Sequence, residues 1–97
     1  MPGANGALEL RWTARGQEDF AYWQRTDKRI AAKIEALIAD TLAHPFTGLG
    51  KPEPLRQEWN GYWSRRITDE HRLIYRVEAG GLYIAQCRFH YAKKKKK

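Results

Sequence analysis

The sequence predicts an α+β domain: two N-terminal helices packed on one face of a twisted, mostly antiparallel sheet, in the order β-α-α-β-β-β-β. Residues 28–43 carry an apolar stripe of helical period, residues 62–91 contain alternating segments separated by turns, and the two kinds of segment are segregated along the chain. With 97 residues there is room for one domain. We expect a flexible extension at residues 1–7, the domain at 8–91 and a Lys-rich tail at 92–97.

The first strand is expected at residues 8–12, where apolar and charged residues alternate. Thr13 is a suitable N-cap for a helix over residues 14–26, because its hydroxyl can accept a hydrogen bond from the first turn. Phe20 and Trp23 lie on one side of this helix, and Gly16 is expected to weaken its first turn by about 1 kcal/mol relative to alanine.

The second helix, over residues 28–43, is the strongest structural signal in the chain. Asp27 is its expected N-cap, and His44-Pro45 ends it, since the residue before a proline disfavours helical angles. Its apolar side chains fall on one face, which is expected to pack on the sheet. They are Ile30, Ile34, Leu37, Ile38 and Leu42.

The second half of the chain is expected to form strands. Residues 47–54 contain two glycines and two prolines and predict a loop. A short edge strand is possible at 55–59, followed by a hairpin of residues 62–67 and 71–78, a turn at 79–81 and a last strand at 82–91.

The charge of the chain is less basic than the total of +7 suggests. Without the lysines at 93–97 the count is 13 basic against 11 acidic residues, a net charge of +2. The second half is rich in arginine, which suits bidentate contacts with phosphate. A single cysteine, Cys87, excludes an internal disulfide and is consistent with a cytoplasmic location. No apolar run is long enough to span a membrane.

Strand alternation predicts which residues face away from the helices. If Leu73, Tyr75 and Val77 point to the helices, then Arg72, Ile74 and Arg76 point to an open face. On the last strand, Ile84, Gln86, Arg88 and His90 share one parity and are assigned to that face. Residues of the other parity, Tyr83, Ala85, Cys87, Phe89 and Tyr91, are expected in the core. Arg72, Arg88 and His90 could then converge.

Glu53 lies between two prolines on the loop before these strands, and proline stiffens a backbone that must aim a carboxylate. A carboxylate, an arginine and a histidine suit RNA cleavage. A base removes the ribose 2′-hydroxyl proton, a cation stabilises the charged transition state, and an acid protonates the departing 5′-oxygen. Each residue also has a simpler interpretation: Glu53 as a solvated loop acid, the histidines as structural groups, and the aromatic residues Trp59, Tyr62 and Trp63 as core.

Other site chemistries are disfavoured. Cys87 and His90 are the only nearby pair of metal-binding type, and no second pair completes a zinc site. Gly48-Leu-Gly50-Lys matches neither a dinucleotide-binding nor a Walker motif. We therefore expect no cofactor. From composition and spacing alone, the chain is a small α+β domain with a possible RNA-binding function.

Four stretches resemble the YoeB (Txe/YoeB) toxins of bacterial toxin–antitoxin systems, which belong to the RelE-like group. They are YWQ at 22–24 with TDKRI at 26–30, PFxGxGKPEPL at 45–55, GxWSRRITxEHRL at 61–73, and CRxHY at 87–91. The resemblance runs from about Leu8 to Tyr91. It implies a RelE-like, microbial-RNase type of fold and an endoribonuclease that cuts mRNA, typically in the ribosomal A site. It also implies a YefM-type antitoxin as partner and a homodimer.

Site residues follow from matching positions. The resemblance implies Glu53 as general base, Arg72 as the phosphate-stabilising cation, His90 as general acid and Tyr91 as its aromatic neighbour. The resemblance implies supporting RNA or phosphate contacts for the basic residues Lys51, Arg65 and Arg66. The open-face assignment adds Arg88 as a fourth such residue.

Two departures from the family pattern stand out. The chain continues past His90-Tyr91 with Ala92 and five lysines, which could perturb a site that uses Tyr91 or a terminal carboxylate. Gln57 stands where family members can carry a histidine, and it cannot titrate. The alternative to an enzyme is a non-catalytic module: an arginine-lined sheet face that holds RNA, or a co-repressor surface in the antitoxin complex.

Overall fold

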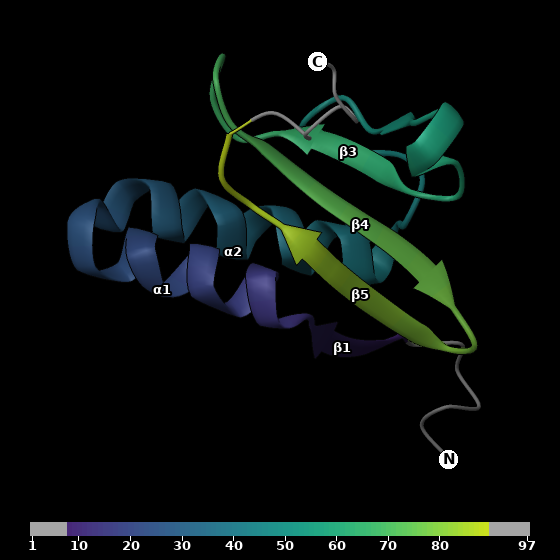
Figure 1. Cartoon of the computed structure of the whole chain (residues 1–97), viewed down its shortest axis with the longest axis horizontal. Coiled ribbons are helices and arrows are strands. Elements are labelled where there is room, and N and C mark those ends of the chain that lie inside the picture. Colours follow the sequence, from purple (N-terminus) through teal and green to yellow (C-terminus); the bar gives the residue numbers. More distant parts are fainter. Residues whose placement is uncertain (1–7, 90–97) are drawn as a thin grey trace.

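The computed structural model describes residues 8–89 and contains two helices and a five-stranded sheet (Figure 1). The elements, in order, are β1 (Glu9–Trp12), α1 (Ala14–Thr26), α2 (Lys28–Ala43), β2 (Glu53–Pro54), a 3₁₀ turn (Gln57–Trp59), β3 (Trp63–Arg66), β4 (Arg72–Glu78) and β5 (Gly81–Gln86). The strand order is β1-β5-β4-β3-β2. Only β1 and β5 are parallel; the other pairs are antiparallel. The predicted fold class is confirmed.

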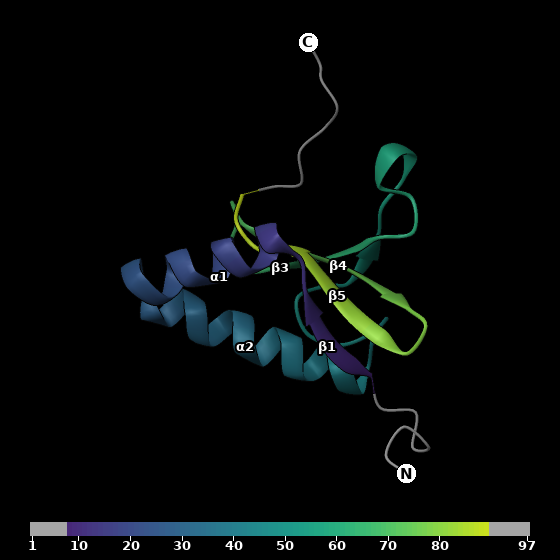
Figure 2. The ribbon, with the colours of Figure 1, turned by 60° about the horizontal axis from the view of Figure 1, so that its bottom comes forward.

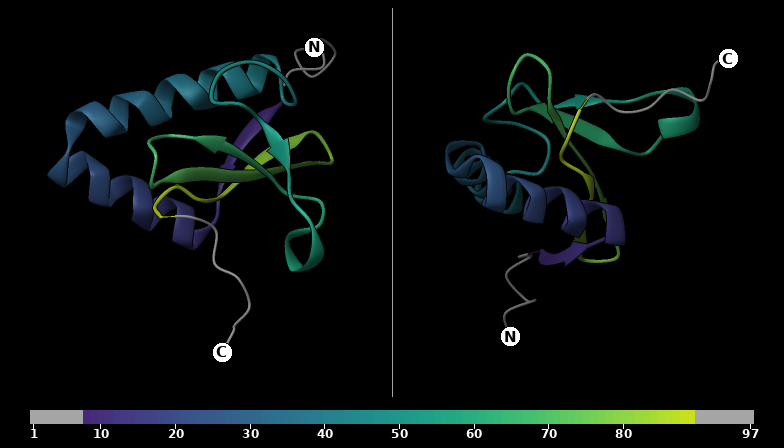
Figure 3. Two further views of the ribbon diagram at one scale, coloured as in Figure 1. Left: turned by 90° about the horizontal axis from the view of Figure 1, so that it is seen from above. Right: turned by 60° about the vertical axis from the view of Figure 1, so that its left-hand side comes forward.

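Both helices cover the same face of the sheet, as the rotated views show (Figures 2 and 3). The stripe predicted for α2 supplies Ile34, Leu37 and Ile38 to the core, where they meet Leu73 and Tyr75 of β4. These five side chains are at most 5% exposed. No helix in residues 8–89 is long and apolar enough to cross a membrane.

Both predicted N-caps are present. The Asp27 carboxylate accepts hydrogen bonds from the backbone N–H groups of Arg29 and Ile30. The Thr13 hydroxyl accepts from Gly16 N–H and donates to Ile84 C=O of β5, so it also joins the helix to the sheet. Gly16 has a packing reason: a Cβ there would lie 2.3 Å from the Ile84 carbonyl oxygen. The glycine therefore permits the close approach of α1 to β5.

The predicted edge strand at 55–59 is wrong. Residues 57–59 form the 3₁₀ turn, and the edge strand is two residues long, Glu53–Pro54. Its antiparallel partner is β3, with Glu53 opposite Ser64. Proline is tolerated at an edge strand, where its missing N–H costs no ladder bond. The last strand ends at Gln86, earlier than the predicted residue 91.

A β-bulge at Ala85 changes which side chains face the helices. Ile84 pairs with Tyr75 and Gln86 with Ile74, so Ala85 is an extra residue in β5. Before the bulge, Ile84 lies in the core and is 0% exposed, while Tyr83 is half-exposed. The assignment of Ile84 to the open face and of Tyr83 to the core was therefore wrong. After the bulge, Gln86 faces away and Cys87 is in the core, as predicted.

Candidate active site

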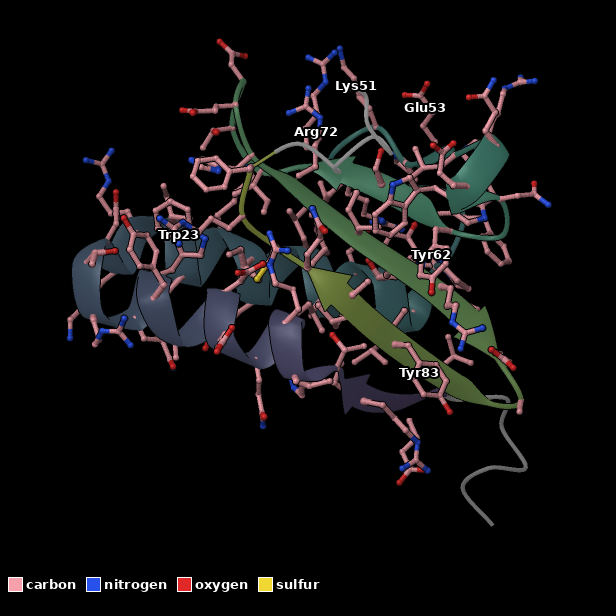
Figure 4. The ribbon with its side chains drawn as sticks, in the orientation of Figure 1. Trp23, Lys51, Glu53, Tyr62, Arg72 and Tyr83 are labelled. Carbon is pink, nitrogen blue, oxygen red and sulfur yellow. The ribbon has the colours of Figure 1, made fainter. Side chains whose placement is uncertain are left out.

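Glu53, Arg66 and Arg72 lie on the face of the sheet that points away from the helices. Glu53 is opposite Ser64, Ser64 is opposite Ile74, and Arg66 is directly opposite Arg72. Residues two apart on a strand share a face, so the arginine pair and Glu53 share theirs. Figure 4 shows Glu53, Arg72 and Lys51 at one end of the sheet. The middle of this face is closed to solvent, since Ser64 and Ile74 are 6% and 0% exposed.

The register gives the scale of the site. Neighbouring strands are about 4.8 Å apart and residues two apart on a strand about 6.7 Å. The Cα atoms of Glu53 and Arg72 are therefore roughly 10 Å apart across the sheet and roughly 7 Å along it. Both side chains are long, so a carboxylate and a guanidinium can approach one phosphodiester group from two sides.

Arg72 is held on one side of its guanidinium. Its Nη1 donates to the carbonyl oxygens of Thr68 (2.7 Å), Asp69 (3.1 Å) and His71 (3.1 Å) in the β3–β4 turn. Among residues 8–89, Nε and Nη2 have no hydrogen-bond partner and no carboxylate forms a salt bridge with Arg72. The side chain is half-buried. A guanidinium fixed in this way is available to an anionic ligand with little loss of side-chain entropy.

Lys51 and Arg66 are exposed beside this pair. The Arg66 N–H donates to Gly50 C=O at 2.7 Å, which ties the loop before β2 to β3. Gly50 and Lys51 both have positive φ, 78° and 53°, so the chain turns sharply just before Glu53. Arg66 directly opposite Arg72 is a like-charge pair, which is unfavourable in a sheet. No salt bridge within the described residues compensates Arg66.

Arg65 is not available to RNA, which corrects its assignment as a phosphate contact. Its side chain is 0% exposed. Its Nε donates to Tyr75 Oη, Nη1 to Asp40 Oδ2 and Leu49 C=O, and Nη2 to the carbonyls of His44 and Thr47, at 2.6–3.2 Å. A guanidinium has five N–H donors, and all five are used inside the protein.

The groups around Arg65 are perturbed by it. The Leu49 N–H and the Arg65 guanidinium bond the Asp40 carboxylate and hold its pKa below the usual range. Burial raises the pKa of Tyr75, whose hydroxyl donates to Pro45 C=O at 2.7 Å. The set formed by Arg65, Asp40 and Tyr75 is therefore a structural cluster that fixes residues 44–49 against the sheet.

Arg88 also lies elsewhere than predicted. It is half-buried, and its guanidinium carbon is 3.6 Å from the ring centre of Tyr22 in α1 and 4.8 Å from that of Phe89. These are cation–π distances. The structure therefore places the Arg88 guanidinium against the rings of Tyr22 in α1 and Phe89.

His90 and Tyr91 lie outside the described residues. The last described residue, Phe89, is bonded to the site: its carbonyl accepts from Arg72 N–H at 3.1 Å and its N–H donates to His71 Nδ1 at 2.6 Å. His71 itself is buried and packs edge-on against Trp23. Its place is structural, as the simpler interpretation of the histidines predicted.

One group of surface side chains emerges only from the register. Arg76 of β4 is opposite Tyr83 of β5, and Tyr83 is opposite Arg11 of β1. The Arg76 guanidinium carbon is 5.6 Å from the Tyr62 ring centre and 5.3 Å from that of Tyr83. Tyr62 and Tyr83 appear on this face in Figure 4. Trp63, by contrast, packs against the core, as the simpler interpretation of this aromatic residue predicted.

Comparison with known proteins identifies the family of this chain. A family described as "YoeB-like toxin of bacterial type II toxin-antitoxin system" matches residues 12–91. Toxin YoeB of Escherichia coli (strain K12) is 55% identical over 84 residues, which are 87% of this chain and all of that protein.

Solved structures give the same result. A YoeB/ParE toxin from Agrobacterium tumefaciens superposes with a TM-score of 0.85 at 52% identity, over 87% of this chain and all of that one. YoeB of Staphylococcus aureus, 38% identical, is known as a dimer (TM-score 0.81, covering 88% and 99% of the two chains) and in a YoeB–YefM complex (TM-score 0.79, covering 87% and 98%). The chain belongs to the YoeB-like family of toxins of bacterial type II toxin–antitoxin systems.

Proposed function

We propose that this toxin is a metal-independent endoribonuclease that cuts mRNA in the ribosomal A site and so blocks translation. The observation that carries the proposal is the pair Arg66–Arg72. Two arginines stand directly opposite each other, without a salt bridge in the described part of the chain, on the face that also presents Glu53. A protein bears such like-charge repulsion at a cost, and a bound phosphate would relieve it.

Each group has a role in strand cleavage. Glu53 removes the proton from the ribose 2′-hydroxyl, and the oxygen attacks the adjacent phosphorus. Arg72 donates hydrogen bonds to the phosphate oxygens as negative charge develops on them. His90 gives a proton to the departing 5′-oxygen, with Tyr91 as its neighbour. The products are a 2′,3′-cyclic phosphate, or its opened form, and a 5′-hydroxyl. Lys51 and Arg66 bind the flanking phosphates.

The test is a cleavage assay on mRNA, with and without programmed ribosomes. Glu53→Gln, Arg72→Ala and His90→Gln are each expected to slow cleavage by roughly 10²- to 10⁴-fold, the usual contribution of such groups. Their thermal midpoints should stay close to that of the parent protein. Glu18→Gln and Arg25→Ala, exposed positions on α1, are matched controls and should cleave normally.

Two results would reject parts of the mechanism. Parent-like cleavage by Glu53→Gln would remove the base, and loss of cleavage in excess EDTA would reject metal independence. The remaining possibility is a non-catalytic module that binds RNA or represses transcription with the antitoxin. In that case growth arrest on expression in bacteria would persist after Glu53→Gln, and a co-expressed antitoxin would still relieve it.

The partners follow from the relatives. The Staphylococcus aureus protein occurs in a complex with YefM and as a dimer. We infer a YefM-type antitoxin and a homodimer for this chain too, in the cytoplasm where ribosomes are translating. Co-purification with a YefM-type antitoxin and light scattering of the free toxin test these two assignments separately.

A further inference from the structure

The backbone of residues 87–89 is held by side chains of α1 and by the start of β4. The Cys87 N–H donates to Asp19 Oδ2 at 3.0 Å, and Cys87 C=O accepts from Trp23 Nε1 at 2.9 Å. The Phe89 N–H donates to His71 Nδ1 at 2.6 Å, and Phe89 C=O accepts from Arg72 N–H at 3.1 Å. Both polar backbone groups of Cys87 and of Phe89 are thus paired just beyond the end of β5.

These contacts hold the backbone of residues 87–89 in place of the hydrogen bonds of a strand pair. Asp19, Trp23 and His71 are 5%, 6% and 9% exposed, so the bonds they make are shielded from competing water. Phe89 has φ 65°, a left-handed conformation that a bulky residue adopts only where its surroundings impose it. The hydrogen bonds at Phe89 N–H and C=O supply that constraint and hold the backbone of residue 89 on both sides.

His71 makes the contact nearest to the proposed general acid. Its Nδ1 accepts from Phe89 N–H, so the proton of the neutral ring is on Nε2. The ring is oriented by Trp23, 4.8 Å between ring centres, and by Phe89, 5.3 Å. His71 also immediately precedes Arg72. One dipeptide therefore carries the proposed transition-state cation and holds the residue to which His90 is joined.

We propose that His71 is a positioning residue for cleavage: by accepting the Phe89 N–H it fixes the backbone from which His90 follows. The inference rests on the proposed function of His90 as general acid. An acid must be aimed closely at the leaving oxygen, and a misplacement of about 1 Å can lower a rate by about 10²-fold. His71 needs no contact with RNA for this role.

Two substitutions of similar shape separate the hydrogen bond from packing. In His71→Asn, the side-chain Oδ1 can take the place of Nδ1 and accept from Phe89 N–H. In His71→Leu, the branching at Cγ is kept and no acceptor remains. We expect His71→Leu to lower the single-turnover cleavage rate roughly 10- to 100-fold with an unchanged KM for RNA, and His71→Asn to recover most of that loss. Rates are compared per folded molecule, after both melting midpoints are measured.

A double-mutant cycle tests whether His71 acts through His90. Once His90→Gln has removed the acid, His71→Leu should cost no further rate, whereas two independent contributions would multiply. Amide exchange at Phe89 is a readout outside catalysis: it should be faster in His71→Leu than in the parent protein and restored by His71→Asn. If His71→Leu folds poorly, Trp23→Phe removes the indole donor to Cys87 C=O, keeps an aromatic ring, and should lower the rate in the same His90-dependent way.

Three outcomes would overturn the inference: a parent-like rate for His71→Leu, a loss in His71→Asn as large as in His71→Leu, or a full additional loss in the His90→Gln background. None of these touches the proposed function, which stands if His90→Gln alone is strongly impaired. Parent-like cleavage by His90→Gln would instead reject the acid assignment and remove the premise of the positioning role.

Discussion

Arg65 and Arg66 are neighbours in β3 and have opposite surroundings. Strand alternation sends Arg65 toward α2, where Asp40 and three loop carbonyls surround it, and sends Arg66 to the outer face beside Arg72. The inner guanidinium has every donor satisfied and its charge balanced by Asp40. Among the described residues, Arg66 and Arg72 have neither a full set of hydrogen-bond acceptors nor a carboxylate that balances their charge. The same side chain is thus a structural tie in one place and, in the proposed function, a binding group for an external phosphate in the next.

The largest effect on stability is expected at the inner position. Arg65→Ala leaves Asp40 and the carbonyls of residues 44–49 without their partner, so we expect a larger loss of unfolding free energy than for substitution of Arg66 or Asp40. Arg65→Lys should recover only part of this, because an ammonium has three donors for five acceptors. Urea unfolding measures both. A parent-like midpoint for Arg65→Ala would mean that the inner cluster contributes nothing, and the comparison would fail.

Arg66→Ala should show the reverse pattern. Removing one member of the opposed pair is expected to leave the unfolding free energy within about 0.5 kcal/mol of the parent value, as for most surface changes. Cleavage efficiency, kcat/KM, should fall about tenfold, the equivalent of one lost charge-assisted hydrogen bond, and its salt dependence should weaken. Arg25→Ala is the control for a general change of charge. If Arg66→Ala lost stability without a change in kcat/KM, Arg66 would have the structural role that we assign to Arg65.

The smallest expected effect on stability concerns Asp40, the carboxylate that pairs with Arg65. Its pKa is lowered by the Leu49 N–H and by Arg65, so its stabilising contribution is present above the unfolded-state pKa, near 4, and is lost as pH falls through the lower folded-state pKa. Asp40→Asn should therefore be less stable than the parent protein at pH 7, with a difference that shrinks toward pH 3. Urea midpoints across this range provide the measurement. A constant difference would indicate that the carboxylate charge is not what Arg65 requires.

The sequence was informative where structure is decided locally. The caps at Thr13 and Asp27 and the α2 stripe are short-range patterns, and each is confirmed. Alternation along the hairpin strands correctly placed Leu73 inside and Arg72 outside. The candidate site came from the family resemblance and from Glu53 between two prolines. The register places Glu53, Arg66 and Arg72 on one sheet face, while the roles of the site residues stay predictions.

What failed depends on distant partners. Nothing near Arg65 in sequence distinguishes it from Arg66, because its acceptors come from residues 40–49 and from Tyr75. Arg88 has no sequence signal for Tyr22, which is 66 positions away and becomes its neighbour only when α1 packs on β5. Alternation along β5 was correct for Gln86 and Cys87, which follow Ala85, and wrong for Tyr83 and Ile84, which precede it, because a bulge has no period and a single extra residue reverses the parity.

That extra residue decides how β5 responds to a change in its length. Ile84 and Gln86 are opposite consecutive residues of β4, Tyr75 and Ile74, so deleting Ala85 would leave an unbroken alternation with Ile84 and Cys87 still toward the helices and Gln86 still toward the outer face. The bulge therefore allows a one-residue change of length at this point without a reversal of the side chains that follow it. The same deletion within a regular stretch of β5 would send every later side chain of the strand to the opposite face.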